Sequence, residues 1–553
     1  MRVLLLLAVN IVAASAVARA DPPPSPRMTA LADKLAAHER GAEDSFWRQL
    51  ATEGTPIFED VHEPGRVLVT FVWRGKPDTQ HVAVIGPVMS PSPEADLLRV
   101  PGSNVFARSL LLPESARFNY FFVVDHDAAK HGSSLAESAH HDPLNRHPFS
   151  PIDSVGVSPR APAQSWLVAH RGASVGAVWH HALRAATPEQ ERQLFVYTPP
   201  GYTTTGPAYP LLVEFDAEAV TGLVPLPLIL DELIAAKKIP PVVALFIGNI
   251  DRTKDLSANP AFADVVALDL VPWMRDRYHA TTDPRRTVIS GISLGGLAAA
   301  YVASRHPETF SNVLSQSGSF WWGPDGAEPE ATARELATSA KLPLRFWTEV
   351  GTLEVGGKDT TMLAANRHLR DVLTLRGYDV SFHEFAGNHT YAAWRGTIAD
   401  GLIALFGTPP KVAAARVARG AKRTPLDVAP ATRSSVFWLL HVALVDGGEA
   451  AVAAAKQLST ANPDSYVVDE HEVDTAGITA LLLDRPRDAL ALLRWNAERF
   501  PNSANAWDDV AWTYLVMGDR VRAIENFKRE LALDPKNAAV ATFVTDLAAL
   551  PSP

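Results

Sequence analysis

Cysteine is absent from this chain of 553 residues, and its absence removes several kinds of chemistry. No disulfide, thiolate metal site or cysteine nucleophile is available to it. The sequence also lacks the H-E-x-x-H pair of zinc peptidases and the glycine-rich loop that cradles phosphate. Basic residues are outnumbered by acidic ones, 51 to 61, so the net charge of −10 argues against a broad nucleic-acid-binding face. We therefore expect neither a cofactor nor a metal ion.

Long apolar runs are missing too, except at the start of the chain. Residues 1–20 place Arg2 before an apolar stretch from Val3 to Val17 and end in the small-residue pattern Ala18-Arg19-Ala20. This is the pattern of a secretory signal peptide, and the run is short for a membrane span. We expect cleavage, a periplasmic or secreted protein, and no membrane span afterwards. The alternative is an uncleaved membrane anchor.

The composition present is that of an ordinary globular protein, with 47% hydrophobic and 20% charged residues. Within residues 28–150, short β-branched and aromatic runs separated by turn residues predict an immunoglobulin-like β-sandwich. The runs are 66–73, 81–85, 105–112 and 118–124. A proline-rich polar segment, 142–162, reads as a linker. Five histidines in and near it are irregularly spaced, which favours a solvated loop over a metal site.

Residues 164–408 alternate between strand and helix patterns and predict a doubly wound α/β domain of the α/β-hydrolase class. Residues 410–553 are alanine-rich and helical. There, Trp507, Ala523 and Pro535 fit the spacing of a tetratricopeptide-like repeat, and Ala489 and Pro501 lie 34 residues before the last two, which is that repeat's period. Two or three such repeats are few for a separate solenoid. We expect them to pack on the hydrolase domain or to bind a protein partner.

The most specific motif is G-I-S-L-G within residues 290–297. A β-branched run, 286–290, precedes it, and a strong helix former, 297–303, follows. This order predicts a nucleophile elbow with Ser293 at the tip of a strand-to-helix turn. The backbone N–H of the next residue, Leu294, would then face a developing oxyanion. The alternative is a glycine-serine turn in a packed core.

A serine nucleophile needs a base, which in α/β-hydrolases follows the last strands. His389 lies in a glycine-containing loop after the strand pattern that ends at Phe385, and it is the best candidate. His383 lies within that strand pattern and His368 on the preceding helix, so both are expected to be structural.

The acid that orients the base should follow the strand that ends at Val350. Glu354 is the first choice and Asp359 the second; a surface carboxylate is the alternative for either. A second oxyanion donor should come from the loop after an earlier strand, and the backbone N–H of Ala217 is the candidate there.

The run S-G-I-S-L-G-G-L-A-A-A-Y, with its continuation S-Q-S-G-S-F-W-W at residues 315–322, resembles the enterochelin esterase family. Further agreement lies in R-T-K-D-L at 252–256, D-L-V-P at 269–272 and N-H-T-Y-A-A-W-R at 388–395. The amino-terminal part resembles that family's first domain, in F-W at 46–47 and D-P-L-N at 142–145. The resemblance covers roughly residues 40–408.

The resemblance implies hydrolysis of the ester bonds of a catecholate siderophore, with Ser293 as nucleophile and His389 as base. A ferric catecholate is strongly anionic, so Arg252, Lys254 and Arg395, together with the neighbouring Trp394, are implied as substrate-binding residues. Four positions depart from the family pattern: Ala217, Asp255, Asn388 and Thr390. The ester could therefore be of another kind, aryl or carbohydrate, and a non-catalytic binding protein is the remaining alternative.

Overall fold

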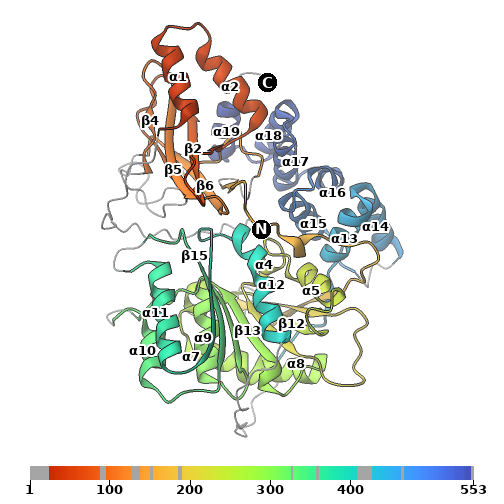
Figure 1. Cartoon of the computed structure of the whole chain (residues 1–553). Coiled ribbons are helices and arrows are strands. Elements are labelled where there is room, and N and C mark those ends of the chain that lie inside the picture. The colour runs from red at the N-terminus through yellow and green to blue at the C-terminus, as the bar shows by residue number, and fades with distance from the viewer. Residues whose placement is uncertain are drawn as a thin grey trace.

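In a computed structural model, the chain forms three parts that lie against one another (Figure 1). The structure describes residues 24–86, 95–126, 138–147, 149, 153–184, 190–324, 328–356, 360–407, 426–461 and 466–549. The predicted signal peptide, residues 1–20, and Asp359 therefore lie outside the described residues. Among the helices in these ranges, none combines the length and the apolar character needed to cross a membrane.

The amino-terminal part is sandwich-like, with two small antiparallel sheets facing each other across an aromatic core. Two helices, α1 (Pro26–Ala36) and α2 (Ala42–Glu53), cover its outer end (Figure 1). One sheet has the order β1-β2-β5-β4; in the other, β6 pairs with β3, β7 and β8. The strands are β1 (Ile57–Glu59), β2 (Arg66–Arg74), β3 (Val82–Ile85), β4 (Leu98–Arg99), β5 (Val105–Pro113), β6 (Arg117–Val124), β7 (Ala139–His140) and β8 (Ser154–Val157).

The predicted linker, 142–162, is partly wrong, because it contains strand β8, which pairs with β6. Two of its polar residues are core groups of the sandwich. Asp142 accepts a hydrogen bond from the hydroxyl of Tyr120 at 2.7 Å, and the amide of Asn145 donates to the backbone oxygens of Thr55 and Val155. Polar composition suggested a loop, but these side chains satisfy buried partners instead.

The central part is built on a mixed nine-stranded sheet in the order β16-β15-β14-β13-β11-β12-β10-β9-β17. The six strands from β16 to β12 run parallel, and the remaining three pair antiparallel. The strands are β9 (Ala177–Leu183), β10 (Arg192–Thr198), β11 (Leu211–Phe215), β12 (Val243–Ile247), β13 (Thr287–Ile292), β14 (Asn312–Gln316), β15 (Arg345–Gly351), β16 (Asp379–Phe385) and β17 (Thr432–Arg433). Strands β11 to β15 are buried throughout, as expected of parallel strands covered on both faces.

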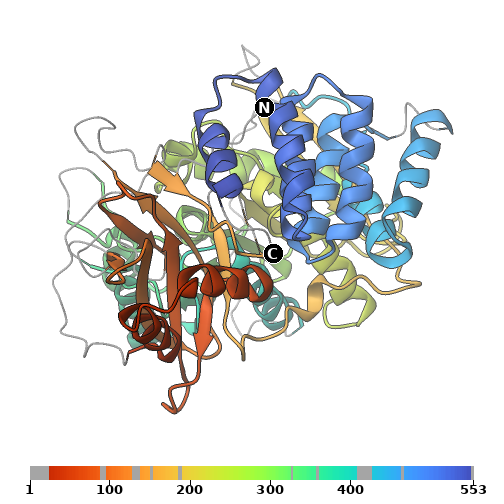
Figure 2. The same ribbon diagram turned by 90° about the horizontal axis from the view of Figure 1, so that it is seen from above.

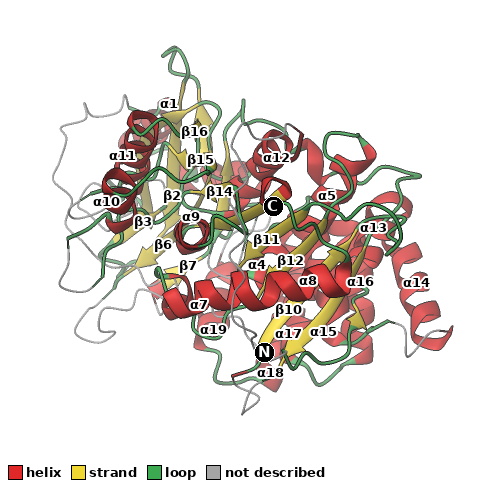
Figure 3. Ribbon diagram, turned by 90° about the horizontal axis from the view of Figure 1, so that it is seen from below, coloured by secondary structure: helices red, strands yellow, loops and turns green. Residues whose placement is uncertain are grey.

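Helices cover both faces of this sheet (Figure 3). On one face, α7 to α11 form one apolar core with the strands. On the other, α4, α5 and α12 form a second core that continues into the carboxy-terminal helices. The helices are α4 (Ala217–Val220), α5 (Leu226–Ala235), α6 (Arg252–Leu256), α7 (Pro260–Val265), α8 (Val271–Tyr278), α9 (Leu294–Arg305), α10 (Ala331–Thr338), α11 (Met362–Leu375) and α12 (Tyr391–Gly407).

The carboxy-terminal part is a row of antiparallel helices that lies along both other parts (Figure 2). It contains α13 (Val436–Asp446), α14 (Gly448–Ala461), α15 (Glu470–Leu482), α16 (Pro486–Arg499), α17 (Ala504–Val516), α18 (Arg520–Leu533) and α19 (Ala538–Ala549). Helices α13, α15 and α17 share one continuous apolar core with α5 and α12 of the hydrolase part. Just before α13, strand β17 pairs with β9 and covers that edge of the central sheet.

The contact between the helical part and the sandwich corrects the expectation of a solvated histidine loop. His141 is only 1% exposed, and its ring lies 5.1 Å from Trp512 and 6.2 Å from Phe543. Burial lowers the pKa of His141 to about 3, so the ring is neutral. Nearby, Asp546 of α19 lies 3.1 Å from the ammonium of Lys76 on the sandwich. Two aromatic rings and an ion pair thus dock α17 and α19 on the sandwich.

Candidate active site

Ser293 lies between β13 and α9 in a backbone conformation that few residues adopt, with φ 60° and ψ −121°. Such a conformation costs about 1–3 kcal/mol and persists only where the surroundings enforce it. The flanking glycines explain how the turn closes: a Cβ on Gly291 would lie 2.3 Å from the backbone of Gly295, and one on Gly296 2.4 Å from the hydroxyl of Ser315. The turn presents the serine hydroxyl beyond the end of β13, as a nucleophile elbow does.

The structure brings Ser293, His389 and Glu354 into one hydrogen-bonded chain. The hydroxyl oxygen of Ser293 lies 2.9 Å from Nε2 of His389, and Nδ1 of the same ring lies 2.7 Å from Oε2 of Glu354. The histidine side chain is 11% exposed and the carboxylate is fully buried. A buried carboxylate on Nδ1 fixes the tautomer in which Nε2 is free to accept the serine proton.

The other oxygen of Glu354 has two further donors that sequence reasoning did not identify. Oε1 accepts hydrogen bonds from the hydroxyl of Ser317 at 2.5 Å and from the backbone N–H of Gly351 at 2.8 Å. The indole N–H of Trp394 in turn donates to the hydroxyl of Ser317 at 2.9 Å. The only signal in the sequence was the position of Ser317 within the S-Q-S-G-S-F-W-W run.

Trp394 lies behind the triad, which changes its predicted role. It is 2% exposed, and its ring stands edge-on to the ring of His389 at 4.6 Å. So little exposed surface leaves no face for a substrate. Trp394 instead supports the imidazole and, through Ser317, the carboxylate of Glu354.

The loop after β11 carries the predicted second oxyanion donor. Ala217 begins α4, so its N–H has no acceptor within the helix, and the same is true of Leu294 at the start of α9. The two helix starts adjoin, because a Cβ on Gly295 would lie 3.4 Å from a carboxylate oxygen of Asp216. Two N–H groups at adjoining helix starts are suited to bind an oxyanion.

Asp216 holds this loop in place through Arg252, one of the predicted substrate cations. Asp216 has a left-handed backbone with φ 57° and is 4% exposed. The guanidinium of Arg252 makes two hydrogen bonds of 2.8 Å to its carboxylate, and the amide of Asn249 makes a third of 2.6 Å. The charge of Arg252 is therefore balanced by the carboxylate of Asp216, and this ion pair orients the loop.

The two other predicted cations lie in different surroundings. Lys254 is exposed on the short helix α6. Arg395, on the first turn of α12, donates from Nε to the side-chain oxygen of Gln164 at 3.0 Å. Burial and the nearby charge of Arg117 lower the pKa of Arg395 to about 10. Arg395 thus points to the junction with the sandwich.

Two carboxyl groups buried in the sheet beneath these loops are held neutral. Burial raises the pKa of Glu214 on β11 and of Glu349 on β15 to about 8. The side chain of Glu349 is hydrogen-bonded to the amide of Gln316 at 2.5 Å and also to the hydroxyl of Thr397. Because both groups are largely protonated at pH 7, they add little negative charge to a site in which an oxyanion would form.

Two protein-family models match the chain. The model described as "Enterochelin esterase, N-terminal" matches residues 68–167, and the model described as "Putative esterase" matches residues 185–405. Both end before the carboxy-terminal helices.

Related proteins match the same two domains. The iron(III) enterobactin esterase of Dickeya dadantii is 29% identical over 426 residues, which cover 68% of this chain and 97% of that protein. The iron(III) salmochelin esterase of Escherichia coli O6:H1 is 28% identical over 427 residues, 69% of this chain and 98% of its own. The crystal structure of the ferric enterobactin esterase from Salmonella typhimurium is 26% identical with a TM-score of 0.53, over 66% of this chain and 98% of that one.

The enzyme from Shigella flexneri, crystallised in the presence of enterobactin, gives 25% identity and a TM-score of 0.53 over 67% of this chain and 99% of its own. These likenesses extend over nearly the whole length of the relatives and include both the sandwich and the α/β part. The chain therefore joins a domain that matches the enterochelin esterase amino-terminal model to an esterase α/β-hydrolase domain; it is a carboxylic ester hydrolase, and it is similar to the enterochelin esterases across both domains.

Proposed function

We propose that the chain hydrolyses its ester through an acyl-enzyme on Ser293, and the observation that carries this is the Ser293–His389–Glu354 hydrogen-bond chain. Nε2 of His389 takes the hydroxyl proton as the serine oxygen attacks the ester carbonyl. The N–H groups of Leu294 and Ala217 stabilise the oxyanion. The imidazolium then protonates the leaving alkoxide. Water, deprotonated by the same ring, releases the acid and restores the serine.

We propose that the substrate is an ester of the catecholate siderophore type. The support is the agreement, across both domains, with esterases named for iron(III) enterobactin and iron(III) salmochelin. Lys254 is an exposed cation near the loop of Asp216 and is suited to an anionic substrate. An aryl or carbohydrate ester is the alternative, because residues in the two catalytic loops, among them Ala217 and Asn388, differ from the family pattern.

The test is turnover of ferric enterobactin, followed by chromatography of the products, beside turnover of p-nitrophenyl acetate and methyl ferulate. Linear fragments of the trilactone, absent with Ser293→Ala, are the expected result. Hydrolysis of the aryl esters without any linear fragment would refute the siderophore assignment and leave the esterase assignment intact. Turnover by Ser293→Ala equal to wild type would refute the serine mechanism.

We propose that the protein acts in the periplasm or outside the cell, which the signal-like pattern of residues 1–20 supports. Expression with and without these residues, followed by cell fractionation and by mass measurement of the mature chain, tests this. A mature chain that retains residues 1–20 in the cytoplasm would contradict it.

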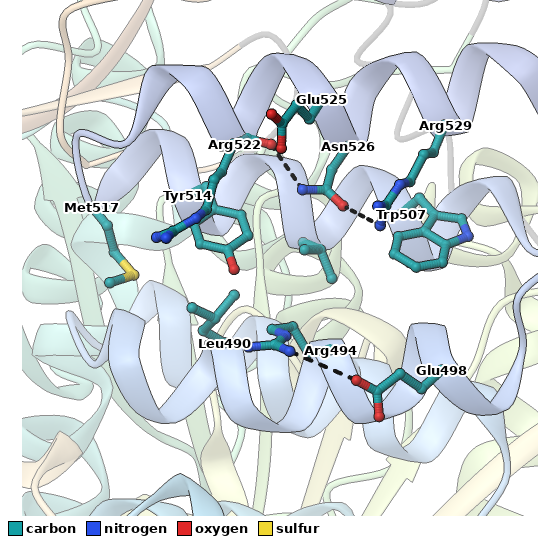
Figure 4. A pocket seen from close by; sticks show the side chains of 11 residues that line it. Leu490, Arg494, Glu498, Trp507, Tyr514, Met517, Arg522, Glu525, Asn526 and Arg529 are labelled. Carbon is teal, nitrogen blue, oxygen red and sulfur yellow. Dashed lines mark hydrogen bonds and ion pairs between the residues drawn. The ribbon is translucent and has the colours of Figure 1, made fainter.

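We propose that the carboxy-terminal helices are tetratricopeptide-like and that their free face takes an acidic protein segment. A groove of about 480 Å³ opens between α16, α17 and α18 (Figure 4). Arg529 lies 4.7 Å above the ring of Trp507, and Arg522, paired with Asp519, lies 5.6 Å above that of Tyr514; on the facing helix Arg494 lies 3.8 Å from Glu498. Guanidinium groups can bind the carboxylates of a peptide, and the aromatic rings beside them can contact its apolar side chains.

The test uses fluorescent peptides that combine Glu or Asp with Leu or Phe, titrated against the full chain by anisotropy. We expect salt-sensitive binding that Trp507→Ala and Arg529→Ala weaken, while a lysine-rich peptide of the same length does not bind. Equal affinity for the acidic and the basic peptide would contradict the proposal.

A further inference from the structure

The loops that carry His389 and Glu354 both leave the central sheet and contact the amino-terminal sandwich. The loop after β16 passes between strand β6 and the loop after β15. On one side, the backbone N–H of Arg117 donates to the carbonyl of Ala386 at 3.0 Å. On the other, the N–H of Leu353 donates to the carbonyl of Gly387 at 3.0 Å. The histidine loop is thus held between the sandwich and the acid loop.

Gly387 shows how closely the three backbones approach. A Cβ there would lie 2.8 Å from the carbonyl oxygen of Arg117, and one on Gly351 would lie 2.4 Å from the carbonyl oxygen of Gly387. No side chain fits between these segments without a backbone shift. A displacement of β6 would therefore be passed directly to the loop that carries His389.

Asn388, immediately before the histidine, is bonded to Asn119 of β6 from both sides of its amide. Its oxygen accepts from the backbone N–H of Asn119 at 3.2 Å. Its nitrogen donates to the backbone oxygen of Asn119 at 2.9 Å and to the side-chain oxygen at 2.8 Å. Asn388 is 3% exposed, so these bonds are shielded from water. The side chain of Asn119 is itself fixed by a 3.0 Å hydrogen bond from its nitrogen to Asp153.

The acid loop is anchored in a different way. Leu353, the residue before Glu354, is 7% exposed and belongs to the apolar core of the sandwich, together with Phe71 and Phe118. A hydrolase residue thus completes the core of the neighbouring domain. Because the side chain of Leu353 is removed from water inside the sandwich, it ties the acid loop to that domain directly beside Glu354.

We propose that the sandwich positions the catalytic base and its acid, and that Asn119, Asn388 and Leu353 are positioning residues for ester hydrolysis. This inference rests on the triad proposed above. The sandwich holds the residues before His389 and Glu354, so it sets the 2.7 Å contact between Nδ1 and the carboxylate. A displacement of about 1 Å in such a pair costs roughly 100-fold in rate.

The experiment compares Asn388→Ala, Asn119→Ala and Leu353→Ala in the full chain, with p-nitrophenyl acetate as substrate. We expect kcat to fall roughly 10- to 100-fold in Asn388→Ala and Leu353→Ala with KM nearly unchanged, because the reacting groups shift and the pocket does not. Asn119→Ala keeps the backbone bonds to Asn388 and should show a smaller fall.

The matched control is Ser109→Ala, which removes the 2.8 Å hydrogen bond to Thr70 inside the same sandwich but away from the hydrolase. It should keep wild-type kcat, and thermal melting shows whether each variant is folded. Folded Asn388→Ala and Leu353→Ala with wild-type kcat, or with a change in KM alone, would overturn the positioning role. An inactive Ser293→Ala beside them would leave the serine mechanism standing, whereas an active one would refute that mechanism separately.

Discussion

Replacement of Glu354 by glutamine tests the geometry of the site most directly, because all three partners of its carboxylate are hydrogen-bond donors. Oε1 accepts hydrogen bonds from the hydroxyl of Ser317 and from the backbone N–H of Gly351, and Oε2 accepts one from Nδ1 of His389. In the variant, the single amide oxygen of the glutamine can take the place of either Oε1 or Oε2, but not of both. The two donors at the Oε1 position will hold it there, so the amide NH₂ will face His389.

That orientation disables the base. Nδ1 of His389 must then accept a hydrogen bond from the amide NH₂, so the ring's own proton lies on Nε2, which faces the hydroxyl of Ser293. A protonated Nε2 cannot take the serine proton. The loss expected for the wrong tautomer is roughly 10³- to 10⁴-fold in kcat, about 4–5 kcal/mol of barrier.

The assay is kcat with p-nitrophenyl acetate at saturation for Glu354→Gln and, beside it, Asp359→Asn, the other candidate acid. We expect Glu354→Gln to lose activity and Asp359→Asn to keep it, with both variants folded by circular dichroism. Activity of Glu354→Gln within about tenfold of wild type would refute the tautomer argument. Loss confined to Asp359→Asn would transfer the role of the acid to that residue.

Three further outcomes are expected. Gly291→Ala places a Cβ 2.3 Å from the backbone of Gly295, so it should destabilise the fold by about 1–3 kcal/mol or more, and an unchanged urea midpoint would contradict this. Asp216→Asn weakens the hold of Arg252 on the oxyanion loop and should lower kcat by up to roughly 10²-fold while KM for a neutral ester stays unchanged; a fall in binding alone would contradict the role given to the pair. The pKa of His141 is lowered from 6.5 to about 3 in the fold, so its neutral form is favoured there, and stability is lost as pH falls from 6.5 toward 3, by about 2 kcal/mol at pH 5. Unfolding of His141→Phe at pH 7 and pH 5 should lack this contribution, and an identical pH dependence in wild type and variant would show that His141 is protonated in the folded protein.

The order of motifs along the chain was enough to name Ser293 and His389 and to make Glu354 the first of two candidate acids; the structure joins these three. The glycines around Ser293, and the positions of Glu354 and His389 after two strand patterns, are local signals tied to strand ends. They predict which residues meet because the carboxyl ends of parallel strands lie at one edge of the sheet.

Contacts between domains left no such signal. Asn119 and Asn388 are separated by 269 positions, and either asparagine alone reads as a loop residue. Arg252 looked like a free cation because its partner, Asp216, belongs to a different strand end. His141 looked solvated because the rings that bury it come from α17 and α19, near the other end of the chain. Each depends on how the three parts dock, and composition and periodicity carry no information on docking.

Strand β17 affects where the chain can be truncated without exposing an edge of the central sheet. The two residues of this strand, with the neighbouring N–H bonds of Ala429 and Ser434 to the backbone of β9, cover the β9 edge of the sheet. An uncovered edge strand is a template for pairing with another chain. An expression fragment that stops at residue 407 would expose β9 together with the apolar side of α5, and we expect it to aggregate. Fragments made to study the esterase alone should therefore keep residues 426–434 and the helices that pack on α5.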